Sequence, residues 1–397
     1  MEMRQNRDGG DTAARLTVAT SLDAFTPEEW AGLRGAMRSD GAYNPFISYD
    51  FLWALEESGC ATRRTGWLGQ HLRLEASDGA LLGAVPCYLK SHSQGEYVFD
   101  YGWADALERA GGRYYPKLQV SVPFTPVTGP RLLTHSDAEE AHVHRALAEG
   151  LVTLANQLGL SSLHVTFAPE QEIGVLQRAG FLTRTDQQFH FFNKGYACYD
   201  DFLETLTSRK RKALKKERRA ALEAGIELEW LTGSDLTEAV WDDFFAFYMD
   251  TGSRKWGRPY LNRLFFSLLG ERMADDILLV MAKRAGRSVA GAINFIGGDA
   301  LYGRNWGAVE HHPFLHFEVC YHQAIEFAIA NKINRVEAGA QGEHKLARGY
   351  VPVTTHSAHY IAHPGLRRAV ADYLSGERRE VEAIGEFLAQ HSPYKKG

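Results

Sequence analysis

The sequence predicts an α+β fold built from two domains, and three observations lead to this class. The chain has 397 residues, more than one hydrophobic core usually supports. Segments with a helical period of apolar residues alternate with segments of strand period. The order of segments in the first half (helices, antiparallel strands, a longer helix, a further strand) returns in the second. We therefore expect a disordered tail at 1–15 and domains at 16–195 and 196–397.

The first half opens with clear helix signals. Thr26, Pro27 and Glu29 form a capping box that begins a helix to about Met37. The stretch 71–90 alternates apolar and polar residues around a Ser-Asp-Gly turn, which predicts a pair of strands. The other expected elements are a helix at 49–58, short strands and shaped loops over 95–133, a helix at 137–158, a strand at 163–167, a helix at 173–179 and a strand at 189–193.

The second half is expected to begin with a basic helix over 200–224. It continues with strands at 226–231, 277–283, 289–297, 300–306, 334–338 and 354–362, and with helices at 234–250, 259–273, 314–331 and 366–389. Hairpin turns are expected at 285–287 and 297–299, where glycine supplies the backbone freedom that a tight turn needs.

Composition narrows the function classes. The formal net charge is −5, so the chain lacks an overall positive field, and a nucleic-acid contact would have to be local. Four scattered cysteines, none in a Cys-x-x-Cys spacing, are typical of reduced thiols in a cytosol. The polar N-terminus and the lack of an 18-residue apolar run predict neither a signal peptide nor a membrane span. We therefore expect a cytoplasmic protein.

Several well-known motifs are missing from the sequence. There is no Walker-type loop, no Gly-x-Gly-x-x-Gly fingerprint and no Gly-x-Ser-x-Gly elbow. Sixteen histidines occur, yet no His-Glu-x-x-His or Cys/His spacing is present, so we expect no metal site. The sequence accordingly predicts no bound cofactor.

Eight segments resemble the Fem-like group of the GNAT superfamily, bacterial proteins named for peptidoglycan biosynthesis or recognition. These segments are 44–59, 91–107, 114–133, 188–193, 208–219, 301–307, 315–329 and 337–350. The resemblance implies two tandem GNAT-like domains, each a mixed central sheet flanked by helices. It also implies an acyltransferase, and in Fem-type enzymes the donor is an aminoacyl-tRNA.

The segment 337–350, EAGAQGEHKLARGY, is the main candidate for the reaction site. The resemblance places a basic residue near the transferred acyl group here, and Lys345 and Arg348 both match. A fixed cation stabilises the oxyanion that acyl transfer develops. Proton acceptors for an attacking amine are also at hand, and Gln341 lies among them. The acceptors are Glu337, Glu343 and His344. The alternative is a solvated turn with an ordinary ion pair.

Two neighbouring segments carry further candidates for substrate binding. Tyr302, Arg304 and Trp306 are expected on one face of a strand by their period of two, which suits a flat or anionic ligand. His316 and Glu318 lie in the first turn of a helix, and Glu318 faces His322 one turn later. The alternatives are a half-buried strand whose Arg pairs with a carboxylate, and an ordinary surface His–Glu pair.

The aromatic segment 91–105 is a candidate acceptor site in the first domain. Glu96 and Asp100 would bind an amine, while Trp103 and its neighbours would stack on a planar or sugar ring. Lys117 has a similar but weaker case. The alternative is a buried aromatic loop whose polar groups are satisfied within the protein.

The run SRKRKALKKERR at 208–219 holds eight basic residues and one Glu. It is a candidate contact for the phosphates of tRNA, of a nucleotide-linked precursor or of a membrane surface. The candidate residues are Arg209, Lys210, Arg211, Lys212, Lys215 and Lys216. The alternative is a solvated helix face, the usual meaning of a charge run.

Three functions stay open at this point. The first is an acyltransferase that moves an aminoacyl group from aminoacyl-tRNA to an amine acceptor, either a small molecule or a precursor. The second is an acyl-CoA-dependent N-acyltransferase, which the lack of an Arg/Gln-x-x-Gly-x-Gly/Ala loop disfavours. The third is a non-catalytic module that recognises a cell-wall precursor. The donor, the acceptor and the oligomeric state do not follow from the sequence.

Overall fold

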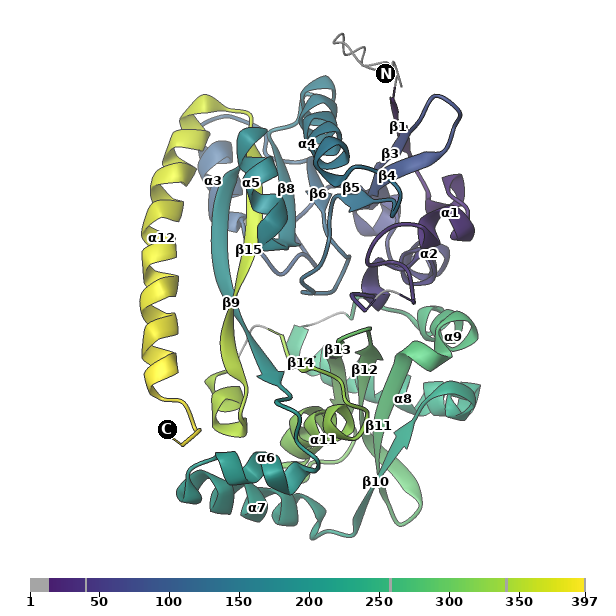
Figure 1. Ribbon diagram of the computed structural model, residues 1–397, viewed down its shortest axis with the longest axis vertical. Helices are drawn as coiled ribbons and strands as arrows, with labels where there is room; N and C mark the ends of the chain where they lie inside the picture. The colour runs from purple at the N-terminus through teal and green to yellow at the C-terminus, as the bar shows by residue number, and fades with distance from the viewer. Residues whose placement is uncertain (1–13, 40, 257–258, 340–341, 396–397) are drawn as a thin grey trace. The chain divides into compact units, whose positions relative to one another are not determined.

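The computed structural model describes residues 14–39, 41–256, 259–339 and 342–395 (Figure 1), without the side chains of 253–256 and Glu343. Most of the tail expected at 1–15 and the candidate Gln341 lie outside these residues. The chain divides into two compact units. Unit 1 combines Met1–Asp186 with Thr355–Val381, and unit 2 combines Gln187–Thr354 with Glu382–Gly397. Compact units are not identical to domains, so the limits 16–195 and 196–397 stay a prediction.

Unit 1 contains two sheets. Its strands are β1 (Arg15–Ala19), β2 (Trp67–Gly69), β3 (His71–Glu75), β4 (Leu81–Val85), β5 (Cys87–Lys90), β6 (Lys117–Val120), β7 (Leu133–Thr134), β8 (Ser162–Ala168), the start of β9 (Leu182–Phe192) and the end of β15 (Val351–Ile361). One sheet has the order β1-β3-β4-β7 and is antiparallel. The other has the order β2-β5-β6-β8-β15, in which only β6 and β8 are parallel.

Helix α4 covers the strands of unit 1 because its apolar residues recur every three to four positions. Val143, Leu147, Leu151 and Leu154 enter one core with the inward residues of both sheets. The helices of this unit are α1 (Pro27–Ala31), α2 (Tyr49–Glu57), α3 (Tyr101–Arg109), α4 (Glu140–Gln157), α5 (Glu170–Arg178) and the start of α12 (Pro364–Gln390). Short 3₁₀ turns lie at Leu22–Ala24, Pro45–Ile47 and Arg63–Thr65.

Two expectations for unit 1 need correction. The capping box of Thr26 and Glu29 forms, but α1 ends at Ala31 and not near residue 37. The segment 95–133 contains helix α3 in addition to strands and loops. Trp103, Ala104 and Leu107 form its buried face, a short amphipathic pattern that the surrounding glycines and aromatics concealed.

In unit 2 the strands of the central sheet pair in the order β10-β11-β12-β13-β14-β9. Its strands are the end of β9, β10 (Ile226–Leu231), β11 (Ile277–Arg284), β12 (Arg287–Ile296), β13 (Ala300–Ala308), β14 (Arg335–Glu337) and the start of β15. Only β13 and β14 are parallel within it. The GNAT-like α+β architecture expected from the sequence is therefore confirmed.

The helices of unit 2 are α6 (Tyr199–Thr205), α7 (Ser208–Leu222), α8 (Glu238–Trp256), α9 (Arg263–Arg272), α10 (Leu315–Phe317), α11 (Gln323–Ala330) and the end of α12. A π-helix at Glu318–His322 joins α10 to α11, and 3₁₀ turns lie at Gly233–Asp235, Ala274–Asp276 and Glu343–Arg348. The π-helix and α11 pack on the sheet through apolar residues such as Val319 and Ile325.

Three expectations for unit 2 are wrong in detail. The basic helix expected over 200–224 is two helices, because Leu206 and Thr207 have extended backbone. The helix expected over 314–331 contains a π-helical turn. Strand β13 carries a bulge between Gly303 and Trp306. Gly303 pairs with Asn294 and Trp306 pairs with Ala292, so an advance of three residues along β13 corresponds to two residues along β12. Each of these irregularities lies beside a candidate site residue.

Among the described residues, no helix is long and apolar enough to cross a membrane. Nor do the described ranges contain a group of three His, Cys, Asp or Glu side chains placed to hold a metal ion.

Candidate functional site

The candidate segment 337–350 contains the turn Glu343–Arg348, which folds back toward the start of the segment. Lys345 is buried, and its Nζ donates to the carbonyl oxygens of Ala338, at 2.6 Å, and Gly339, at 3.0 Å. Burial lowers the pKa of Lys345 to about 8. An ammonium group has three N–H donors, so among the described residues one donor is left for a ligand. Gly342 and Gly349 flank the turn at positive φ, which favours glycine.

Arg348 has a different environment. Its Nε and Nη2 donate to both carboxylate oxygens of Glu217 in α7, at 2.8 and 2.6 Å, and its Nη1 donates to the carbonyl of His344 at 2.6 Å. The guanidinium lies 3.5 Å from the centroid of the Phe317 ring. The charge of Arg348 is thus compensated inside the unit. Of the two cations that the sequence leaves open, Arg348 is paired with a carboxylate, whereas Lys345 bonds to backbone carbonyls and to no carboxylate among the described residues.

Aromatic rings and histidines surround this turn. Tyr321 and His344 share a hydrogen bond of 3.1 Å between the hydroxyl and Nε2, and the Phe317 ring lies 5.4 Å from that of His344. The rings of His316 and Trp306 meet edge to face at 5.3 Å. Burial and the neighbouring Arg348 and Lys345 lower the pKa of His344, so its imidazole is neutral at pH 7 and is able to accept a proton.

The π-helix decides where Glu318 and His322 point. In a regular α-helix they would face together, but this pair does not form. Buried Glu318 accepts from Arg218, at 2.7 Å, and from Gln323 five residues on, at 2.8 Å. Buried His322 contacts Glu217 through Nε2, at 2.9 Å, and the hydroxyl of Tyr199 through Nδ1, at 2.6 Å. The predicted His–Glu acid–base pair is therefore wrong, and both residues bind α6 and α7 or their own helix.

The bulge in β13 separates the three strand candidates. Tyr302 pairs with Phe295 and Trp306 with Ala292, and these two β12 residues are three positions apart, on opposite faces. Arg304 stays with Tyr302, at 5.4 Å from the ring centroid. The prediction that all three share one face is wrong: the Trp306 ring packs on His316, while the charge of Arg304 helps to lower the pKa of Lys345.

Glu337 and the remaining loop candidates lie as follows. Buried Glu337 accepts from Arg335 Nε at 3.0 Å, and its second oxygen lies 3.9 Å from His190 Nε2. Glu337 is therefore held by Arg335 on its own strand and lies beside His190 on β9, whose pKa is also affected by the charge of Lys345. The side chain of Glu343 and the whole of Gln341 lie outside the described residues, so their roles stay predictions.

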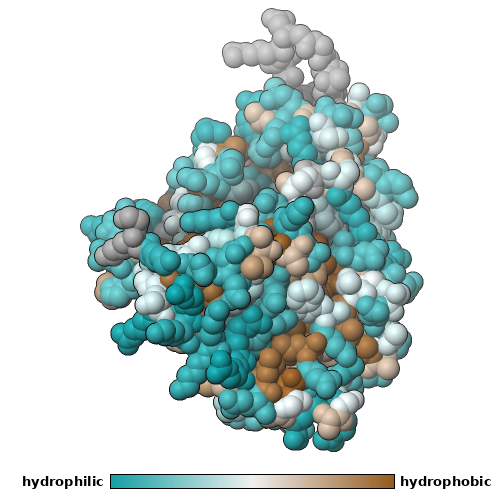
Figure 2. Space-filling model, turned by 60° about the horizontal axis from the view of Figure 1, so that its bottom comes forward, coloured by the Kyte–Doolittle hydropathy of each residue, from teal (hydrophilic) through white to brown (hydrophobic). Residues whose placement is uncertain are grey.

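Helix α7 has two unlike faces. Leu214, Glu217, Arg218 and Ala221 face the unit at helical spacing. The opposite face is an exposed basic stripe of Arg209, Lys212, Lys216 and Arg219. Lys210 and Arg211 are partly covered, and exposed Lys215 pairs with Asp200 at 2.9 Å. Figure 2 turns forward the side on which Figure 1 labels α6 and α7; hydrophilic residues cover much of this face, with a brown apolar patch among them.

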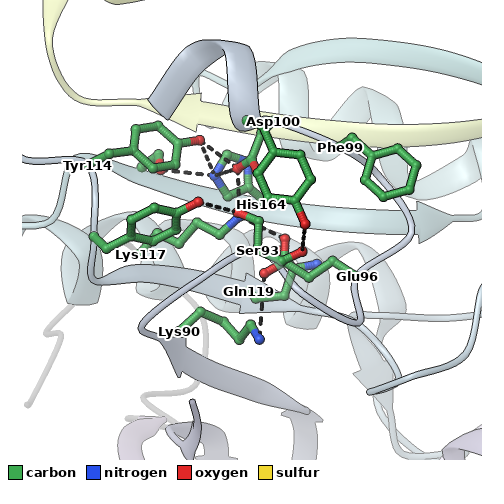
Figure 3. Close-up of polar contacts among 12 residues, drawn as sticks. Lys90, Ser93, Glu96, Phe99, Asp100, Tyr114, Lys117, Gln119 and His164 are labelled. Carbon is green, nitrogen blue, oxygen red and sulfur yellow. Dashed lines mark hydrogen bonds and ion pairs between the residues drawn. The ribbon is translucent and has the colours of Figure 1, made fainter. Parts of the chain in front are cut away.

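The first-domain candidates form a buried charge cluster in unit 1 (Figure 3). Lys117 Nζ donates to Ser93 Oγ at 2.7 Å, Glu96 Oε2 at 2.7 Å and Asp100 Oδ2 at 2.5 Å. Burial alone would lower the pKa of Lys117, but the two carboxylates outweigh it and raise that pKa. Burial likewise raises the pKa of Glu96 to about 7.

More groups complete this cluster. Asp100 Oδ2 also accepts from the Tyr114 hydroxyl at 2.6 Å, and His164 Nδ1 lies 2.7 Å from His359 Nδ1. The Trp103 ring packs edge to face on His359 at 4.9 Å. The side chains of Glu96, Asp100 and Lys117 are at most 2% exposed. The cluster is buried and its charges pair with one another, as the alternative interpretation of this segment expects. Its polar groups are not all satisfied, because Glu96 Oε1 and Asp100 Oδ1 are buried without a hydrogen-bond partner among the described residues.

Sequence reasoning missed several of these residues. Glu217 was the one acid in a basic run, and only its spacing from Leu214 and Ala221 marked it as inward-facing. The helical period of 315–329 places Tyr321 among apolar residues, and no pattern distinguishes its hydroxyl. Lys90 stands at the end of a strand, and nothing in the sequence shows that its ammonium lies 3.5 Å from the centroid of the Trp67 ring.

Fold and site together define a protein with two GNAT-like parts. The chain matches one family model over residues 21–396, nearly its whole length. It therefore belongs to the FemAB-like family, described as peptidoglycan biosynthesis/recognition. No curated protein matches the sequence significantly.

Three solved structures are similar to this chain. L-PGS from Bacillus licheniformis has a TM-score of 0.50 at 9% identity, over 86% of this chain and 96% of that one. FemX has a TM-score of 0.49 at 11% identity, over 80% and 93%. A tandem GNAT protein from the clavulanic acid biosynthesis pathway has a TM-score of 0.45 at 12% identity, over 88% and 99%. At such low identities a likeness speaks for the fold alone.

Proposed function

We propose that this protein is an acyltransferase that moves an aminoacyl group from aminoacyl-tRNA to an amine on a peptidoglycan precursor. The observation that carries the proposal is Lys345, a buried ammonium with one N–H donor left among the described residues, placed beside the neutral imidazole of His344. Family membership and the GNAT-like fold support the reaction class. Support for tRNA as donor comes from the basic stripe of α7.

The chemistry follows from these groups. The acceptor amine attacks the ester carbonyl of the donor, and the carbonyl oxygen becomes an oxyanion that the remaining N–H of Lys345 stabilises. His344 takes the proton that the attacking nitrogen loses and returns it to the ribose oxygen as the ester bond breaks. An amide forms, the tRNA leaves with a free hydroxyl, and the residues return to their starting protonation.

The Tyr321 hydroxyl has a supporting role in this scheme. Its contact of 3.1 Å with His344 Nε2 fixes the plane of the imidazole. Burial raises the pKa of Tyr321, so its hydroxyl stays protonated. A base that accepts a proton at Nε2 needs the tautomer with the ring proton on Nδ1. In that tautomer the hydroxyl donates to Nε2 and must release it before proton transfer.

A mass-spectrometric inspection of the purified protein, run natively and then denatured, tests the donor. Co-purifying tRNA that carries an amino acid is the expected result and would identify the acyl group. Bound CoA or acyl-CoA would instead move the protein to the ordinary N-acyltransferases. A protein that binds a soluble peptidoglycan precursor but neither donor would favour the non-catalytic recognition module.

A further inference from the structure

We propose that Glu217 is a positioning residue, which holds Arg348 and thereby fixes the turn that presents Lys345 and His344 to the reacting groups. This inference rests on the proposed function for its catalytic meaning. Its structural part concerns one unit only, since Glu217, Arg348 and the turn Glu343–Arg348 all belong to unit 2.

The contact between Glu217 and Arg348 is bidentate. Two parallel bonds, of 2.8 and 2.6 Å, join the guanidinium edge to the two carboxylate oxygens, a geometry that fixes orientation as well as distance. The third nitrogen of Arg348 donates to the backbone carbonyl of His344 at 2.6 Å. One rigid planar group therefore connects the carboxylate on α7 to the backbone of the candidate base.

The carboxylate of Glu217 is itself held from a second side. His322 Nε2 lies 2.9 Å from Glu217 Oε1, and the other ring nitrogen of His322 contacts the Tyr199 hydroxyl at 2.6 Å. His322 is fully buried in the π-helix. Burial alone would raise the pKa of Glu217, but the bonds from His322 and Arg348 outweigh it and lower that pKa. The residue is therefore ionised at neutral pH.

The Phe317 ring completes the restraint. It covers one face of the Arg348 guanidinium, with its centroid 3.5 Å from the guanidinium carbon. The same ring lies 5.4 Å from that of His344. Without Glu217, the guanidinium of Arg348 would lose the two hydrogen bonds that hold it in its plane and would tilt against the Phe317 ring. The carbonyl of His344 accepts from the same guanidinium and would move with it. We expect Lys345 to shift with the turn, because the hydrogen bonds of its side chain reach only Ala338 and Gly339 among the described residues.

The test compares Glu217→Ala, the isosteric Glu217→Gln, Arg348→Ala and the double variant Glu217→Ala/Arg348→Ala. Glu223→Gln, an exposed acid at the end of α7, is the matched control. Hydrogen exchange of the 343–350 amides is measured without substrate, and kcat and KM for transfer are measured with charged tRNA and soluble peptidoglycan precursors. Melting temperatures show which variants are folded.

We expect faster exchange at 343–350 in both Glu217 variants and a fall in kcat of about tenfold to 100-fold, with KM little changed. The double variant should be no worse than Arg348→Ala, since Glu217 acts through Arg348. Additive losses in the double variant, or unchanged exchange and kcat in folded Glu217→Gln, would overturn the proposal. If the wild-type protein transfers no acyl group, the proposed function fails, and the exchange experiment alone still decides whether Glu217 fixes the turn.

Discussion

Lys117 Nζ and Asp100 Oδ2 lie 2.5 Å apart inside unit 1, and neither side chain is more than 2% exposed. Glu96 is paired with the same ammonium at 2.7 Å and is equally buried. A buried pair of this kind tolerates the loss of one member poorly, because the remaining charge has neither water nor a counter-ion. These contacts make the cluster a feature of stability.

Replacing Lys117 with Met is expected to lower the free energy of unfolding of unit 1 by about 3–5 kcal/mol. Two buried carboxylates lose the ammonium that they share, and Glu96 keeps only the longer contact of 3.8 Å with Lys90. Urea denaturation measures the change. The matched control is Arg109→Met, which removes an exposed pair with Asp105 and should cost less than about 1 kcal/mol. Equal effects of the two substitutions would show that the cluster does not depend on the charge of Lys117.

Glu172 should make the stability of unit 1 depend on pH. Burial raises its pKa from 4.5 to about 7, while it accepts the backbone N–H groups of Arg131 and Leu132 at 3.0–3.3 Å. Between these two pH values the folded state therefore binds more protons than the unfolded state. The stability that Glu172 contributes is lost as pH rises from about 4.5 to 7.

The size of this effect follows from linkage and is roughly 3 kcal/mol over the interval. Glu172→Gln should flatten the pH dependence of the unfolding free energy by that amount, whereas exposed Glu170→Gln on the same helix should leave it unchanged. A Glu172→Gln variant with the wild-type slope would contradict the assignment.

The basic stripe of α7 should set the salt dependence of tRNA binding. Changing Arg209, Lys212, Lys216 and Arg219 to Gln is expected to weaken binding and to make the plot of log K against log salt shallower, by about 0.7–0.9 for each phosphate that the variant no longer neutralises. Fluorescence anisotropy at several salt concentrations measures this slope. Exposed Lys332→Gln, elsewhere in unit 2, is the control. An unchanged slope in the fourfold variant would leave the stripe as solvated surface.

His344 should appear in the pH–rate profile. Its lowered pKa means that the imidazole accepts protons at neutral pH and loses this ability only in acid, so the rate should fall as pH drops below about 6.5. His344→Gln is expected to lose roughly 100-fold or more in kcat and to abolish that acid limb. Exposed His391→Gln should change neither quantity.

The sequence predicted most of the helices and strands but not the irregularities within them. The α+β class and most element positions follow from apolar period, and the resemblance supplied the GNAT-like fold. The bulge in β13 and the π-helix at Glu318–His322 each shift the register of side chains, and no local pattern in this sequence marks either of them. For this reason Trp306 does not share a strand face with Tyr302, and His322 does not face Glu318.

The candidate site was predictable in outline because Lys345, Arg348 and His344 are neighbours in the chain. The choice between the two cations was not, since it depends on Glu217, which is more than 100 residues away and reaches Arg348 only in the folded unit. The buried location of Lys117 was hidden for the same reason: its counter-ions, Glu96 and Asp100, come from the loop that leads into α3, before its own strand.

The rate at which wild-type protein and Lys345→Ala move a labelled amino acid from charged tRNA to soluble peptidoglycan precursors tests the central claim most directly. We predict transfer by the wild-type protein and a loss of roughly 100-fold or more in Lys345→Ala, the range seen when one oxyanion donor is removed. The matched variant Lys332→Ala should keep full activity. A folded Lys345→Ala protein with the wild-type rate would contradict the account.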